Sequence, residues 1–391
     1  MENSKMLKRY QKSLIASAVV GSLAFTSAAQ AAEPEFSFGG YVKLDAFMSD
    51  YSDGSAPASG NLGRQFYIPS LTPVGGTGDD AISDFHARQS RLFMDVTQEL
   101  SNGESVAAHV EIDFLTMPDG NERVSSSYAP RIRQAYIKYG NWTVGQAWSN
   151  FMNLSTLPEA VDFIGTTDGV AFNRQPLIKY SDGGWSFSIE NPETTVSPNG
   201  GGARITSSDG VMPDFTAKYT GKSGDLSYSV AGILRQLAYD VDGDSSDETT
   251  GAYGVSLSAK YMLGDDDIRA SFTMGSGLGR YLGLNTFNDA VIDANGELEA
   301  IDVMGVTLAY RHVWSETSRS SFTYSRGWAD NDTALIGTGT TESTQRIGVN
   351  YMYSPDKALT FGVELSQATR ELDNGVDGDM TRLHFMAMYK F

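Results

Sequence analysis

Basic side chains recur at alternate positions along many short segments of this 391-residue chain. Successive residues of a β-strand point to opposite faces, so two-residue parity assigns these cations to one polar face. Guanidinium and ammonium groups bind carboxylates, and a ladder of fixed cations raises the local anion concentration in a narrow passage. The basic residues that parity assigns to the polar face are Lys43, Arg91, Lys138, Lys179, Lys218, Lys260, Arg269, Arg311, Arg346, Arg382 and Lys390.

The acids on the same face are fewer than the cations. They are Asp45, Asp95, Glu111, Asp113, Glu190 and Glu364. The polar face is therefore net basic, although the whole chain carries a net charge of −19, and we expect the surplus acid in long loops such as 240–248, 289–299 and 371–379. The pattern predicts a preference for anions, but one alternative stays open, because the cations can simply balance neighbouring acids across strands.

Metal chemistry has weaker support in the sequence. His109, Glu111 and Asp113 share one strand face. The ordinary polarity of a strand face that meets water explains them, so no metal site is predicted. Residues 240–251 begin like a calcium loop, yet Ser245 stands where such a loop requires glycine and Gly251 where it requires glutamate. That segment leaves room only for weak cation binding at the surface.

No catalytic residue and no cofactor are predicted. The glycines at 275, 277 and 279 interrupt a strand rather than open a helix, so they do not form a phosphate-binding loop. The chain has four histidines and no G-x-S-x-G elbow, which gives a hydrolase triad little support. Two alternatives to a pore remain, an outer-membrane hydrolase barrel and a non-conducting barrel that serves as adhesin or receptor.

The elements that must position the cations are strands. The clearest is the C-terminal segment 380–391, where apolar and polar residues alternate and the chain ends on Phe391. Sixteen such segments are predicted, at 36–48, 85–100, 104–116, 130–140, 141–149, 175–182, 184–192, 212–220, 225–239, 250–263, 267–281, 301–314, 319–329, 343–353, 358–371 and 380–391.

The connections between these segments alternate between short turns and long loops. Turns such as 101–103 and 182–183 separate links such as 49–84, 117–129 and 150–174. Short periplasmic turns and long extracellular loops are typical of an outer-membrane barrel, and closure removes the unpaired edges that lipid cannot solvate. The sequence therefore predicts an all-β fold, a transmembrane antiparallel β-barrel of sixteen strands that occupies residues 32–391 as a single domain.

The N-terminal residues predict export. Basic residues between Lys5 and Lys12, a short apolar run over 14–25 and the Ala29-Gln30-Ala31 triplet form a signal peptide, 1–31, with cleavage after Ala31. Its net charge of +3 leaves about −22 on the rest of the chain, which argues against nucleic acid as a partner. The predicted location is the outer membrane of a Gram-negative bacterium, in contact with lipid and lipopolysaccharide.

The segment 150–174 is unusually apolar for an external loop. It holds Phe151, Leu154, Leu157, Val161 and Phe163 beside several acids. We expect it to fold into the lumen as a constriction, where Asp162 and its neighbouring acids face wall cations across the passage. An ordinary surface loop is the alternative.

Three stretches resemble the DcaP-like outer-membrane porins. They are "ARQSRLFMDV" (87–96), "RIRQAYIKYGNWTVGQAWSNFM" (131–152) and "LPEAVDFIGTTDGVAFNRQPLIKYS" (157–181). The resemblance implies a homotrimeric, sixteen-stranded channel that favours small anionic solutes bearing carboxylates, such as dicarboxylic acids. Some relatives carry a periplasmic N-terminal coiled coil, whereas here the first strand directly follows the signal peptide, which assigns the trimer contacts to the barrel walls.

The resemblance also implies site residues. The arginines of "RQSR" (Arg88 and Arg91), of "RIR" (Arg131 and Arg133) and of "NRQP" (Arg174) are expected to bind a carboxylate, because a guanidinium fork matches its two oxygens. With them, the predicted pore-lining set contains Lys43, Lys138, Arg311, Arg346, Asp113 and Asp162. Arg131 and Arg133 do not share the parity of Tyr136 and Lys138, which predicts a rim position or a β-bulge between the two pairs.

Overall fold

The computed structural model describes residues 32–56, 59–78, 80–117, 120–121, 124–240 and 248–391. The predicted signal peptide, 1–31, lies outside the described residues, and so does 241–247, most of the calcium-loop-like segment. In the described part of the chain, no helix combines the length and the apolar character needed to cross a bilayer.

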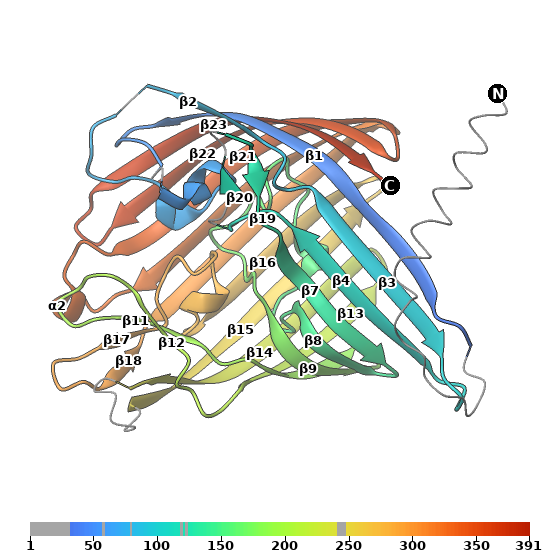
Figure 1. Cartoon of the computed structure of the whole chain (residues 1–391). Coiled ribbons are helices and arrows are strands. Elements are labelled where there is room, and N and C mark those ends of the chain that lie inside the picture. The colour runs from blue at the N-terminus through green and yellow to red at the C-terminus, as the bar shows by residue number, and fades with distance from the viewer. Residues whose placement is uncertain (1–31, 57–58, 79, 118–119, 122–123, 241–247) are drawn as a thin grey trace.

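Sixteen antiparallel strands form a closed barrel (Figure 1). They are β1 (Glu35–Tyr51), a second strand made of β2 (Ile82–His86) and β3 (Arg91–Glu99), β4 (Ser105–Asp113), β7 (Arg131–Tyr139), β8 (Trp142–Trp148), β9 (Arg174–Asp182), β10 (Trp185–Glu190), β13 (Asp214–Ser223), β14 (Leu226–Tyr239), β15 (Glu248–Leu263), β16 (Asp266–Ser276), β19 (Asp302–Ser315), β20 (Ser318–Asp330), β21 (Thr341–Asp356), β22 (Leu359–Leu372) and β23 (Asp377–Lys390).

The barrel closes between the first and the last strand. β1 pairs with β23, with Leu44 opposite Ala387, and on its other edge β1 pairs with β3 and β2. The predicted strand 85–100 is interrupted between His86 and Arg91, so it is two strands on one edge of β1. The fold class and the strand number predicted from the alternation are confirmed.

The outer face of the barrel is apolar, as the two-residue parity predicts. The exposed apolar side chains on this face include Val42, Leu44, Leu92, Ile137, Val144, Ile178, Phe215, Leu257, Ile268, Leu308, Phe322, Val349, Leu365 and Phe385. Aromatic pairs such as Trp142–Tyr180 and Trp185–Tyr219 lie beside the short turns, with ring centroids 5.1 and 4.9 Å apart. Such a face is stable only against hydrocarbon, with aromatic rings at its polar border.

Short turns and long loops sit at opposite ends, with one exception. The last two strands, β22 and β23, are joined by residues 373–376 alone, so the prediction of an acidic long loop over 371–379 is wrong. Asp377 to Asp379 extend the ladder instead, with Asp379 opposite Thr369, and Gly375 makes the tight turn at a φ of 77°. The alternation signal was obscured there because the strand ends are acidic.

The long loops carry secondary structure of their own. The chain between β10 and β13 and the chain between β16 and β19 build a small sheet from β11 (Thr194–Ser197), β12 (Ile205–Ser207), β17 (Ala290–Ile292) and β18 (Leu298–Ala300). β11 and β17 pair in parallel, at the left of Figure 1. The short helical turns are η1 (Ser59–Arg64), η2 (Pro69–Leu71), η3 (Leu154–Thr156), η4 (Gly279–Tyr281) and α2 (Thr333–Ile336).

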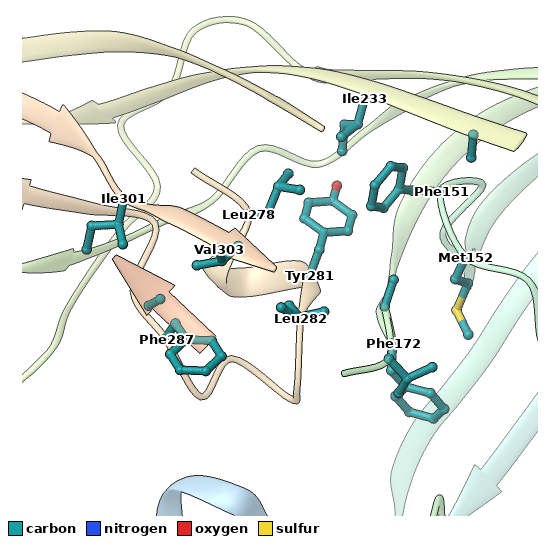
Figure 2. Packing of buried hydrophobic residues seen from close by; sticks show 14 of the residues in the cluster. Phe151, Met152, Phe172, Ile233, Leu278, Tyr281, Leu282, Phe287, Ile301 and Val303 are labelled. Atoms are coloured by element: carbon teal, nitrogen blue, oxygen red, sulfur yellow. The ribbon is translucent and has the colours of Figure 1, made fainter. Parts of the chain in front are cut away.

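A large apolar cluster joins these loops to the inner wall. Figure 2 shows Tyr281 beside Phe151 and Leu278, with Ile233 of β14 close by. The ring centroids of Phe151 and Tyr281 are 5.8 Å apart in an edge-to-face arrangement. Because this cluster packs loop residues against wall residues such as Ile233 and Val303, the barrel holds a packed interior that the strand pattern alone does not predict.

Candidate functional site

The segment between β8 and β9, residues 149–173, crosses to strands far along the chain. The backbone N–H of Gly169 donates to Ser325 Oγ on β20 at 2.8 Å, and that of Val161 donates to Glu364 Oε2 on β22 at 2.9 Å. Asn350 Nδ2 on β21 donates to the carbonyl of Glu159 at 2.8 Å. We call residues 149–173 the inner loop, because its contacts are with inward-facing side chains.

Glycine permits the closest of these approaches. A Cβ on Gly169 would lie 2.2 Å from the carbonyl oxygen of Val306, and one on Gly305 would lie 2.6 Å from the carbonyl oxygen of Gly169. Any larger side chain would push loop and wall apart, because real Cβ contacts do not reach such distances. The backbone of the inner loop therefore lies directly on the wall at this point.

A second loop, residues 52–81, reaches the same region. The Tyr67 hydroxyl donates to Asp168 Oδ1 at 2.7 Å, and the Tyr67 backbone N–H donates to Asp162 Oδ2 at 3.1 Å. Arg382 donates to the carbonyl of Gly63 at 2.9 Å. This link was expected outside the barrel, although its apolar residues Leu62, Phe66, Ile68 and Leu71 are the kind of signal that singled out 150–174.

Five arginines predicted as site residues lie near one another at the loop end of β3, β4, β7 and β9. Arg133 pairs with Glu111 at 2.7 Å and with Asp113 at 2.8 Å, and it is buried. Arg131 donates two hydrogen bonds to Asp113, of 2.6 and 3.1 Å. These short, charge-assisted contacts with Glu111 and Asp113 neutralise most of the charge of Arg131 and Arg133.

The parity break at the "RIR" motif is a β-bulge, as one of the two predicted explanations states. The β4–β7 register shifts between Glu111 and Ile112, which turns both Arg131 and Arg133 inward. Arg91 Nη1 lies 3.4 Å from Glu111. Arg88 follows the break between β2 and β3, where its guanidinium stacks 3.9 Å over the Tyr128 ring.

Arg174 differs from its neighbours Arg131 and Arg133, because no carboxylate among the described residues lies within ion-pair distance of it. Its guanidinium sits 4.8 Å over the Trp148 ring, and Nη1 is buried without a hydrogen-bond partner. A cavity of about 390 Å³ opens beside it, which we call the arginine cavity. Its lining consists of Leu62, Phe66, Ile68, Ser70, Leu71, Thr116, Arg131, Phe163, Phe172, Asn173, Arg174 and Leu284.

Three further residues of the predicted pore-lining set, Lys43, Asp162 and Arg346, are nearly fully buried. Lys43 pairs with Asp45 at 2.9 Å and donates to the carbonyl of Val161 at 2.7 Å. Arg346 pairs with Glu364 at 2.5 Å and donates to the carbonyl of Gly165. Asp162 accepts from Tyr67 in the loop contact described above. These three side chains hold the inner loop rather than face open water.

Two wall acids escaped the sequence analysis. Asp267, with no exposed side-chain surface, pairs with Arg269 at 2.6 Å, Arg311 at 2.8 Å and Lys260 at 3.6 Å. Asp214 pairs with Arg235 at 3.1 Å. Both are the first or second residue of a strand, where parity is hardest to assign. Much of the wall charge is therefore balanced across strands, the alternative that the sequence left open.

No three His, Asp or Glu side chains within the described residues are placed to share a metal ion. Lys138 has an exposed side chain on β7, below the arginines, and its ammonium lies 5.4 Å from the Tyr136 ring centroid. It lines a separate cavity together with Lys179 and Lys218.

The buried carboxyl of Asp168 makes the loop contact sensitive to pH. Burial raises the pKa of this inner-loop residue to about 6 from 3.8, despite the Tyr67 hydrogen bond that lowers it. The folded state therefore holds the proton more tightly than the unfolded state, and stability is lost as pH rises through about 6. From this group we expect a free energy of unfolding about 1.4 kcal/mol higher at pH 5 than at pH 8, since about one pH unit separates pH 5 from the folded-state pKa.

Urea unfolding in lipid vesicles at the two pH values measures this difference. Asp168→Asn keeps an acceptor for Tyr67 and should lose that part of the pH dependence. An unchanged pH dependence in Asp168→Asn would show that another group carries it.

The fold recurs in solved outer-membrane proteins. The outer membrane channel DcaP of Acinetobacter baumannii superposes with a TM-score of 0.74 at 22% identity, over 94% of this chain and 100% of that one. OmpT of Vibrio cholerae gives 0.54 at 10% identity over 94% and 99%, and Salmonella typhi OmpF, solved with daunomycin, gives 0.52 at 11% over 93% and 100%. At these identities the likeness shows the fold alone.

The sequence comparison goes further than the fold. No curated protein matches the chain. The family model described as DcaP outer membrane protein matches residues 35–391, which is nearly the whole of the barrel. This protein of the Gram-negative outer membrane therefore belongs to the DcaP outer membrane protein family, a family of porin-like channels.

Proposed function

We propose that the protein is a passive diffusion channel for small hydrophilic solutes, with a preference for anions that bear carboxylates, such as dicarboxylates. The observation that carries the proposal is the unpaired guanidinium of Arg174 in the arginine cavity. A buried cation without a counter-ion is costly, and a solute carboxylate offers the bidentate partner that its fork fits.

The surroundings of Arg174 suit an anion with an apolar body. Arg131 lines the same cavity, but its guanidinium is already engaged, because Nε and Nη2 donate to Asp113 and Nη1 donates to Thr116. Phe66, Phe163 and Phe172 supply apolar surface on the other sides. One carboxylate at Arg174, with the carbon chain against the rings, is the arrangement that the cavity supports best.

The inner loop supplies the constriction in this proposal. Arg346, Lys43 and the glycine contact at Gly169 fix it to the wall, so the arginine cavity keeps a defined shape. Arg91 and Arg133 act as positioning residues, because they hold Glu111 and Asp113 in place beside Arg131. Arg88 stacks on the Tyr128 ring at the edge of the same group of arginines.

The remaining features of the proposal concern processing and assembly. The signal peptide is cleaved after Ala31, the mature barrel contacts lipid and lipopolysaccharide through its apolar outer face, and three copies associate through their walls. The protein acts as a channel and not as an enzyme.

The apolar cluster around Tyr281 favours a second candidate function. Loops that fill the interior so tightly suit a non-conducting barrel that serves as adhesin or receptor. Conductance separates the two functions, since a plugged barrel carries no steady current.

Planar bilayers with a potassium chloride gradient test both candidates. We expect steady single-channel currents with a reversal potential on the anion side, and a decrease of chloride current as succinate is added. A reversal potential on the cation side would contradict the anion preference. Folded protein that inserts but never conducts would favour the receptor function instead.

A further inference from the structure

A second basic cavity lies on the turn side of the inner loop. It measures about 290 Å³ and is lined by three lysines, Lys138, Lys179 and Lys218, together with hydroxyl and amide side chains that include Thr143, Ser149 and Asn153. We call it the lysine cavity. Trp148, whose ring also contacts the Arg174 guanidinium, lines it too.

The sheet register brings the lysines together. Lys138 lies opposite Thr143, and Thr143 lies opposite Lys179, so the first two lysines stand in one row two strands apart. Lys218 lies opposite Ser186, two strands beyond β9 and one inward pair closer to the turns. Neighbouring strands are about 4.8 Å apart, so the flexible side chains can reach a common point inside the barrel.

The three positive charges are not neutralised by the protein. Across the described residues, none of the three ammonium groups lies within 4.0 Å of a carboxylate, whereas Lys43 and Lys260 each have an ion-pair partner. Lys218 donates only to the carbonyl of Met152, at 3.0 Å. Lys138 and Lys179 also act on each other as like charges, which raises the cost of leaving them without an anion.

The acid that acts on Lys179 and Lys218 is Glu190, and its oxygens are already used. Oε1 accepts from the Asn150 backbone N–H at 2.8 Å, and Oε2 accepts from Gln175 Nε2 at 2.6 Å. Glu190 is also buried, with 2% of its surface exposed. Glu190 therefore lowers the excess positive charge of the cavity, but it accepts no hydrogen bond from the lysine ammonium groups among the described contacts.

We propose that the lysine cavity binds a compact, doubly charged oxyanion, such as inorganic phosphate or the phosphate group of a small solute. Ammonium groups are point charges that impose no plane on their ligand, unlike the guanidinium fork of Arg174. A tetrahedral dianion accepts from three such groups at once, and the neighbouring hydroxyls of Thr143 and Ser149 offer further donors. This site stands apart from the carboxylate preference of the arginine cavity.

Calorimetric titration of the folded, detergent-solubilised protein with inorganic phosphate tests the site. We expect saturable binding by the unmodified chain, and an apparent dissociation constant about tenfold higher for both Lys138→Met and Lys179→Met, since each removes one close charge. Lys218 is left unchanged, because it also holds the inner loop at Met152. If Lys179→Met does not fold, Lys138→Met alone answers the question, since that side chain is exposed and touches no loop carbonyl.

Matched variants separate this site from a general charge effect and from the arginine cavity. Lys222→Met removes an exposed lysine on the same strand as Lys218, outside the cavity, and should leave phosphate binding unchanged. Arg174→Gln should also keep it, even where carboxylate binding is lost. The proposal is overturned by absent phosphate binding, by equal weakening in Lys222→Met, by loss in Arg174→Gln, or by succinate binding more tightly than phosphate in the Arg174→Gln background.

Discussion

Replacing Arg174 with glutamine is expected to weaken succinate binding by about ten- to a hundredfold. Arg91, Arg131 and Arg133 each have a carboxylate within ion-pair distance, whereas Arg174 has none among the described residues, and its Nη1 is buried without a hydrogen-bond partner. A hydrogen bond to a charged group contributes about 1.5–3 kcal/mol, and each 1.4 kcal/mol is a tenfold change. The succinate concentration that halves the chloride current in planar bilayers measures the effect.

The outer face of the barrel supplies a matched control. Arg326 on β20 lies 5.9 Å over the Trp328 ring, as Arg174 lies over Trp148, but it faces away from the lumen. Arg326→Gln removes the same charge and should leave the succinate effect intact. Arg174→Lys should restore only part of it, because an ammonium cannot form the fork. Equal succinate sensitivity in Arg174→Gln and the unmodified channel would remove Arg174 from the binding site.

Replacing Arg346 with methionine is expected to lower the free energy of unfolding by about 3–5 kcal/mol. Arg346 and Glu364 are paired at 2.5 Å, with side chains 2% and 4% exposed. Without the guanidinium, Glu364 keeps a buried charge, and the inner loop loses its contact at Gly165. Urea unfolding in lipid vesicles gives the midpoint, and larger current fluctuations in bilayers would report the released loop.

Two variants decide whether burial of the charge causes this loss. Arg346→Met combined with Glu364→Gln leaves no unpaired charge and should recover part of the stability. Arg319→Met breaks a loop contact of the same kind, to Glu159, but that carboxylate is 32% exposed, so the cost should stay below about 1 kcal/mol. If Arg319→Met and Arg346→Met are equally unstable, the buried pair has no special role.

The sequence by itself determined the wall. Alternation at a period of two is a local property, so it can be read from neighbours in the chain, and it predicts the sixteen strands and the apolar outer face. It even registered the parity break at Arg131 and Arg133, which is the bulge opposite Glu111. The interruption between His86 and Arg91 was missed, because four residues without a turn signal do not disturb the pattern.

The tertiary structure decided which cations are free. Alternation within each strand assigns Lys43, Arg311 and Arg346 to the polar face together with Lys138. The first three are paired with acids, whereas Lys138 has no ion pair among the described residues. Asp45 lies on the same strand as Lys43, but Asp267 and Glu364 lie on the strands next to their arginines. Loop contacts such as Glu159 with Arg319 join residues far apart in sequence. Pairing across a closed sheet depends on register and on which loop lies above, and neither is encoded in the spacing along one strand.

The interior was likewise settled by long-range packing. Loop 52–81 turns inward because Tyr67 finds a partner in Asp168, and the chain around Tyr281 buries its apolar side chains against Phe151. Each loop has enough apolar side chains to need burial. Which part of the inner wall they can pack against depends on the radius of the closed barrel. The strands are thus specified by local alternation, while the two proposed anion sites lie where the packed loops leave cations without a carboxylate partner among the described residues.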